Sequence, residues 1–91
     1  MSDGAPRYER AAVLMEAELG DELVALDPDR GHCFGFNPVA AAVWRLLEHP
    51  RSAAEIEAEL TEQFAVEKAQ CHEEVAELLE DLQGRGLVRA V

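Results

Sequence analysis

The sequence predicts an α+β fold in which a three-stranded antiparallel β meander precedes three α-helices and a short C-terminal extended segment. Residues 13–36 hold three short β-type segments separated by turn sequences, and residues 38–83 hold three segments with helical periodicity. A chain of 91 residues is long enough for one domain. We expect that single domain to cover residues 11–91, after a flexible N-terminal arm over residues 1–10.

Alternation and turn chemistry predict the meander. Apolar side chains alternate with glutamates over residues 13–19, and a second β-type segment follows over residues 22–27. Gly20-Asp21 provides the first turn. Residues 27–31 provide the second, in which a proline fixes its own φ and the final glycine accommodates a positive φ. The third strand, over residues 32–36, lies at the outside of the meander and therefore has an unpaired edge.

The change from strand to helix is expected at Asn37-Pro38, because asparagine is a good N-cap and proline suits the first helical position. Apolar residues at helical spacing follow over residues 39–47, and Pro50 ends this first helix.

Ser52 and Glu55 form a capping box, so a second helix begins there. Its buried stripe, at spacing i, i+4, i+8, consists of Ile56, Leu60 and Phe64. The third helix is expected over residues 67–83, ended by Gly84 and Gly86, with a closing extended piece at Leu87-Val88. Its apolar residues are Cys71, Val75, Leu78, Leu79 and Leu82.

Composition argues against two classes of partner. The formal charge of −11 comes from 19 acidic against 8 basic residues, whereas binding to nucleic acid requires clustered lysine and arginine. The last helix, which would enter the major groove in a helix-turn-helix protein, is strongly acidic. No apolar run is long enough to cross a bilayer, and residues 1–7 lack the apolar centre of a secretory signal. We therefore expect a soluble cytoplasmic protein with neither a nucleic-acid nor a membrane partner.

The sequence contains no recognisable catalytic or metal-binding motif. It has no glycine-rich phosphate loop, no Gly-x-Ser-x-Gly and no Cys-x-x-Cys. Its two Cys-His neighbours, His32-Cys33 and Cys71-His72, would each supply one zinc ligand, because adjacent side chains diverge, and zinc requires four. We expect no enzyme activity, cofactor or metal, and we interpret both cysteines first as small buried apolar residues.

The unpaired edge of the third strand is the feature that suggests binding. A peptide can add to such an edge as a further strand, and Gly35 leaves the backbone there accessible. The alternative interpretation is that the edge is merely short enough to be harmless.

The chain resembles the PqqD-like peptide chaperones, a family also called RiPP recognition elements. The resemblance extends over about residues 12–89 and rests on an ordered set of segments. These are Val24-Ala25-Leu26-Asp27, Gly31, Phe34-Gly35-Phe36-Asn37, Ala41-Ala42-Val43-Trp44-Arg45-Leu46-Leu47, Arg51-Ser52-Ala53-Ala54-Glu55-Ile56, Leu60, Phe64, Val75, Leu78-Leu79, Leu82 and Gly86-Leu87-Val88. The Asp-Pro-Asp-Arg-Gly turn and Phe-Gly-Phe-Asn look closer to the discrete recognition proteins of lasso-peptide clusters than to the PQQ-pathway members.

This resemblance implies a winged-helix-like fold with a cleft between the third strand and the third helix. It also implies a non-catalytic protein that binds the leader of a ribosomally made precursor peptide by strand addition. The protein would then present that precursor to a maturation enzyme, such as a lasso-peptide protease and cyclase or a radical SAM enzyme. The implied peptide-binding residues are His32, Cys33, Phe34 and Gly35 on the strand, with Glu74, Val75, Leu78, Leu79 and Leu82 on the helix.

Two alternatives remain open at this point. One is a winged-helix-like dimerisation or scaffold module in which the strand edge pairs with a second protomer. The other is a DNA-binding regulator.

Overall fold

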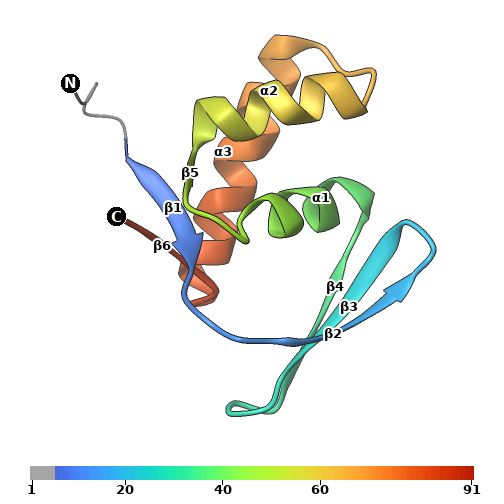
Figure 1. Ribbon diagram of the computed structural model, residues 1–91, viewed down its shortest axis with the longest axis vertical. Coiled ribbons are helices and arrows are strands. Elements are labelled where there is room, and N and C mark those ends of the chain that lie inside the picture. Colours follow the sequence, from blue (N-terminus) through green and yellow to red (C-terminus); the bar gives the residue numbers. More distant parts are fainter. Residues whose placement is uncertain (1–5) are drawn as a thin grey trace.

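A computed structural model describes residues 6–91 as an α+β fold with three helices and two three-stranded antiparallel sheets (Figure 1). The strands are β1 (Arg7–Arg10), β2 (Met15–Leu19), β3 (Glu22–Asp27), β4 (His32–Phe36), β5 (Arg51–Ser52) and β6 (Val88–Ala90). The helices are α1 (Pro38–Leu46), α2 (Ala53–Gln63) and α3 (Lys68–Gly84). No helix within this part of the chain is long and apolar enough to cross a membrane.

The predicted meander is confirmed as a sheet with the strand order β2-β3-β4. Its first strand begins at Met15, two residues after the predicted start. Leu19 pairs with Glu22 across a two-residue turn, in which Gly20 has a φ of 67°. Glycine suits the first central position of such a turn because that position requires a positive φ. At the other end of β3, the buried carboxylate of Asp27 accepts hydrogen bonds from the backbone N–H groups of the next turn.

A second sheet, with the order β5-β1-β6, was not predicted from the sequence. Arg7 pairs with Ser52, and Tyr8 pairs with Ala90, so segments far apart in the chain lie side by side (Figure 1). The predicted flexible arm therefore differs from the structure at residues 7–10, which form β1. Residues 1–5 of that arm lie outside the described residues.

Strand β2 turns its glutamate side, and not its apolar side, toward the helices. The glutamate side faces the helices: Glu16 accepts a hydrogen bond from the indole N–H of Trp44 at 2.9 Å, and Glu18 pairs with Arg45 at 2.6 Å. Arg10 stacks on the Trp44 ring, with its guanidinium carbon 4.3 Å from the ring centroid. Trp44 is fully buried, so Glu16 provides the partner that its N–H requires.

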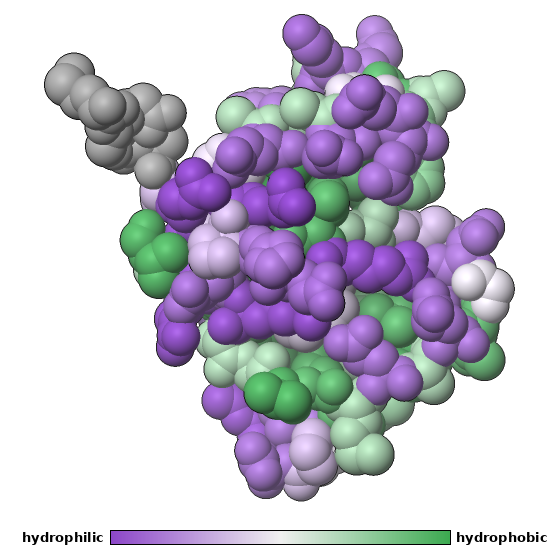
Figure 2. Space-filling view, in the orientation of Figure 1, coloured by the Kyte–Doolittle hydropathy of each residue, from purple (hydrophilic) through white to green (hydrophobic). Residues whose placement is uncertain are grey.

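The apolar side of β2 consequently faces solvent, which leaves Met15 63% exposed and Leu19 64% exposed. Strand pairing extends this apolar surface across β3 and β4, and part of it is visible in the lower half of Figure 2. We call this surface the outer sheet face. Its residues are Met15, Ala17, Leu19, Val24, Leu26 and Cys33.

The core lies between the inner side of this sheet and the three helices. Phe36 stacks on Trp44 with ring centroids 5.8 Å apart, which fixes the sheet against α1. Ile56 and Leu60 of the predicted α2 stripe are buried, and Phe64 is half-buried. The fully buried Leu87 then leads into β6, where a closing extended segment was predicted.

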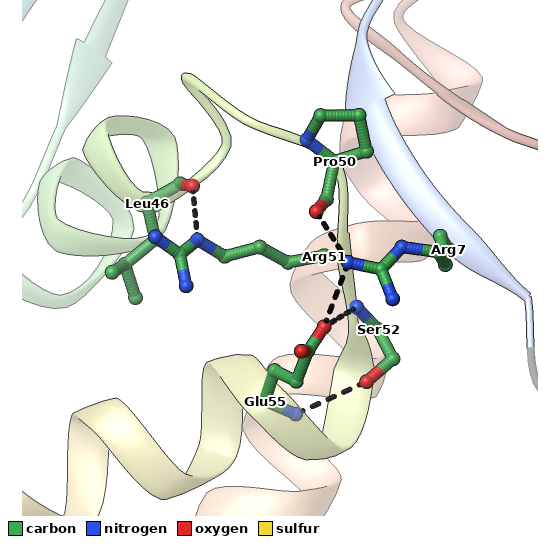
Figure 3. Close-up of polar contacts among 6 residues, drawn as sticks. All are labelled: Arg7, Leu46, Pro50, Arg51, Ser52 and Glu55. Atoms are coloured by element: carbon green, nitrogen blue, oxygen red, sulfur yellow. Dashed lines mark hydrogen bonds and ion pairs between the residues drawn. The ribbon is translucent and has the colours of Figure 1, made fainter.

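The start of α2 is fixed by the predicted capping box (Figure 3). Ser52 Oγ accepts a hydrogen bond from the Glu55 N–H at 3.2 Å, and Glu55 Oε1 accepts one from the Ser52 N–H at 2.8 Å. Arg7 of β1 pairs with the same carboxylate at 3.3 Å and donates to the carbonyl oxygen of Pro50. The backbone hydrogen bond from Ser52, together with the charges of Arg7 and Arg51, lowers the pKa of Glu55.

We expect Ser52→Ala to reduce the free energy of unfolding by about 1 kcal/mol, since it removes the side-chain acceptor from the α2 N-terminus. Chemical denaturation at neutral pH measures this change, and Ser52→Thr, which keeps a hydroxyl, is the control. Because the pKa of Glu55 is lowered on folding, its stabilising contribution is present above its ordinary pKa. That contribution is lost as the pH falls through the lowered pKa. Equal stability of Ser52→Ala and the wild type would contradict the role of the cap.

A candidate peptide-binding groove between β4 and α3

Strand β4 is an edge strand among the described residues, and the pairing pattern identifies which of its backbone groups point outward. In antiparallel strands the residues alternate between those that bond across the ladder and those that do not. Leu19 and Glu22 flank a two-residue turn, so their backbone groups hydrogen-bond to each other between β2 and β3. Three positions further along β3, the alternation directs the N–H and C=O groups of Ala25 away from β2 and toward Phe34 of β4. By the same alternation, the N–H and C=O groups of Cys33 and Gly35 point to the free edge.

A groove runs beside this edge, between β4 and α3. Its part nearest the strand has a volume of about 340 Å³, and an adjoining part of about 360 Å³ lies between α3 and the start of α1. The two parts share Asn37, Ala40, Leu78 and Asp81, so we treat them as one groove, the β4–α3 groove. Its other lining residues are Cys33, Phe34, Gly35, Phe36, Val39, Glu74, Glu77, Leu82 and Arg85.

The α3 wall of the groove is apolar at its base and charged at its rim. Leu78 is half-buried and lines both parts of the groove, whereas Leu82 is almost fully buried and reaches only the part beside the strand. Across the groove, Phe34 is half-buried at its base. Leu78 and Phe34 are therefore the two larger apolar side chains available to an incoming ligand.

The charges on the rim differ between the two ends. Glu74 and Glu77 lie at the end near α1, and within residues 6–91 no basic side chain lies within ion-pair distance of either. At the opposite end Arg85 pairs with Asp81 at 3.0 Å and lies 6.0 Å from the Phe34 ring centroid.

The structure brings together only part of the predicted set of peptide-binding residues. Cys33, Phe34, Gly35, Glu74, Leu78 and Leu82 line the groove, and His32 is exposed at the start of β4, with its ring edge-on to Phe34. Val75 and Leu79 instead belong to the core, where they are 1% and 2% exposed, and neither lines the groove. Sequence reasoning did not single out Asn37, Val39, Ala40, Glu77, Asp81 and Arg85. Helical spacing from Glu74 and Leu78 would have found Glu77, Asp81 and Arg85, which lie on the same side of α3.

The two cysteines lie in different surroundings. Cys71 is buried, as expected, and burial together with the nearby Glu57 and Glu74 raises the pKa of its thiol, which keeps it protonated. Cys33 is exposed on the outer side of β4, so the expectation that it is buried was wrong. Within residues 6–91, no three His, Cys, Asp or Glu side chains are grouped so that they could hold a metal ion.

Comparisons with known proteins bear on the family and the fold. The family model described as coenzyme PQQ synthesis protein D (PqqD) matches residues 22–88. A solved structure described as TbiB1 in complex with the TbiA(beta) leader peptide matches with a TM-score of 0.77 at 23% identity, covering 89% of this chain and 94% of that one. At this identity the match concerns the fold alone.

A second solved structure, described as lasso peptide synthetase B1 complexed with the leader peptide, matches with a TM-score of 0.71 at 27% identity. The match covers 90% of this chain and 96% of that one. None of the curated proteins compared with the chain matches it.

Proposed function

This chain belongs to the PqqD family, and from that premise we propose that it binds the leader of a ribosomally synthesised precursor peptide and presents it to a separate modifying enzyme. The leader adds to β4 as a further antiparallel or parallel strand, and the chain itself catalyses no reaction. Lasso-peptide biosynthesis is the pathway we favour, because a lasso peptide synthetase B1 bound to its leader shares this fold.

The observation that carries this proposal is an open sheet edge lying directly beside a groove. The outward N–H and C=O groups of Cys33 and Gly35 offer a ladder for an added strand. The adjoining groove, with Leu78 and Phe34 at its base, offers apolar surface for alternate side chains of that strand. Each new backbone hydrogen bond contributes about 0.5–1.5 kcal/mol, so buried side chains must supply much of the affinity.

Presentation requires a second surface, and we assign it to the outer sheet face. Of the five large apolar residues that are exposed in residues 6–91, three lie there: Met15, Leu19 and Leu26. An added leader strand would extend this same sheet and direct every second side chain to the same face. An enzyme docked there would therefore contact both the recognition protein and the leader.

Charge favours an enzyme over a second copy as the occupant of the outer sheet face. Asp21 and Glu22 lie at one end of the face and Asp29 lies in the turn at the other. Two copies, each with a formal charge of −11, would bring these acidic ends into one contact. We therefore expect the partner surface to be apolar, with basic residues at its margin.

The direct test is a titration of the folded chain with the leader of the precursor encoded beside it. We expect saturable binding with an affinity in the micromolar range or tighter, and spectral perturbations confined to β4, α3 and the start of α1. A folded sample that gives no saturable signal with that leader contradicts the proposal. A stable dimer indifferent to peptide would favour the scaffold alternative, and retardation of DNA at low salt would favour the regulator.

Substituting each of two neighbouring leucines should distinguish an effect on leader binding from an effect on folding stability. We expect Leu78→Ala to weaken leader binding by about tenfold with a small change in stability, because this half-buried side chain lines the groove. Leu79→Ala should reduce the free energy of unfolding by about 2–5 kcal/mol, because this side chain is in the core. Titration and chemical denaturation of both variants measure the difference. If folded Leu78→Ala binds the leader with unchanged affinity, Leu78 is not part of the peptide-binding site.

A further inference from the structure

The two ends of the β4–α3 groove differ in charge, and a bound peptide would be exposed to that difference. At the end near α1, the carboxylates of Glu74 and Glu77 are exposed. Among residues 6–91, the only hydrogen bond or ion pair to either carboxylate comes from the neutral amide of Gln70, which donates to Glu74 at 3.3 Å. These two carboxylates lie one turn apart on α3, so both border the same stretch of groove. Their combined charge remains available to a ligand.

At the opposite end of the groove the charged side chains are paired with one another. Arg85 already neutralises Asp81, and Arg30 approaches the same place, donating a hydrogen bond to the backbone carbonyl of Arg85 at 3.1 Å. Arg30 also pairs with Asp27 at 3.8 Å, so each of the two guanidinium groups near the Phe34 end of the groove has a carboxylate partner. The groove therefore has a negative end near α1 and a neutral end, where each charge is paired, beside the first half of β4.

We propose that this polarity selects the leader and fixes its direction, a refinement that rests on the function proposed above. The leader places a lysine or arginine against Glu74 and Glu77. At the Phe34–Arg85 end it places an apolar or acidic side chain. A leader inserted in the reverse direction would bring its cation to Arg85 and leave Glu74 and Glu77 without a partner, which lowers its affinity.

The geometry of α3 gives the spacing of these two leader residues. The segment from Glu74 and Glu77 to Arg85 spans roughly 12–16 Å of helix axis, or about four to five residues of extended chain. Side chains four residues apart lie on the same side of a strand. The expected leader therefore carries its cationic residue four positions from an apolar or acidic one.

The experiment is a selection from a displayed library of random 20-residue peptides against the immobilised full chain. We expect the enriched peptides to carry lysine or arginine at a constant distance from an apolar or acidic residue. One enriched peptide is then synthesised and titrated. Glu77→Lys should weaken its binding about tenfold, and changing the peptide's cationic residue to glutamate should restore binding to that variant.

Glu62→Lys is the matched control, because Glu62 is exposed on α2, lines no part of the groove and changes the net charge equally. Equal weakening by Glu62→Lys and Glu77→Lys, or enriched peptides without a charge preference, would overturn the inference. If those peptides still lose binding to Gly35→Pro, the groove functions as proposed and only its polarity is wrong. A selection that yields no groove-binding peptide contradicts the proposed function itself.

Discussion

Replacing Gly35 with proline is expected to weaken leader binding strongly while the protein remains folded. The N–H of residue 35 points to the free edge of β4, so proline removes a donor that the added strand requires, and its ring occupies the edge. The lost hydrogen bond and the unpaired leader carbonyl together cost about 2–4 kcal/mol, which is roughly a 30-fold to 1,000-fold loss of affinity. Titration with the leader measures it.

Gly35→Ala is the matched control for this prediction. A Cβ added at Gly35 meets no heavy atom within 4 Å, and its φ is not positive, so alanine fits and keeps the N–H. Binding should therefore remain close to that of the wild type. Comparable losses in Gly35→Ala and Gly35→Pro would mean that side-chain bulk, not strand addition, determines binding.

The second large effect is expected on the outer sheet face. Met15→Glu or Leu19→Glu should leave leader affinity unchanged. Each should slow processing of the precursor by its enzyme about 30-fold or more, because the interface with the enzyme loses an apolar anchor. Both side chains are more than 60% exposed, so their replacement costs the fold little. Leader titration and a processing assay with the purified enzyme measure the two quantities separately.

Val91→Glu is the control for the outer face, because Val91 is similarly exposed at 61% but follows β6 in the other sheet. It should leave processing unchanged. If the enzyme processes the precursor at the wild-type rate in the presence of Met15→Glu or Leu19→Glu, the outer sheet face is not the enzyme contact. A change in oligomeric mass instead would assign this face to a second copy.

Local signals account for what could be predicted from the sequence. The meander follows from alternation and turn residues, and the helices follow from an N-cap at Asn37 and a capping box at Ser52, both present in the structure. Strand β1 lacks such a signal, because its partners Ser52 and Ala90 are distant in the chain. Long-range pairing of a four-residue strand leaves no local pattern.

Alternation defines two sides of a strand but not which side faces inward. The glutamates of β2 face inward because the Trp44 N–H, Arg10 and Arg45 provide partners for them, which only the folded chain reveals. Helical periodicity likewise identified the apolar residues of α3 without showing which of them face the groove. Leu78 and Leu79 are adjacent members of one apolar set, and the position of β4 decides that the first borders the groove while the second fills the core.

The pairing of β1 with β6 also constrains the order of folding. Glu9 and Arg89 form an ion pair at 2.6 Å across this ladder, although 80 positions separate them in the chain. During synthesis, β1 cannot pair with β6 until almost the whole domain has emerged from the ribosome. Contacts of such high sequence separation slow folding, so we expect substitutions in these two strands to act on the rate at which the native state is reached.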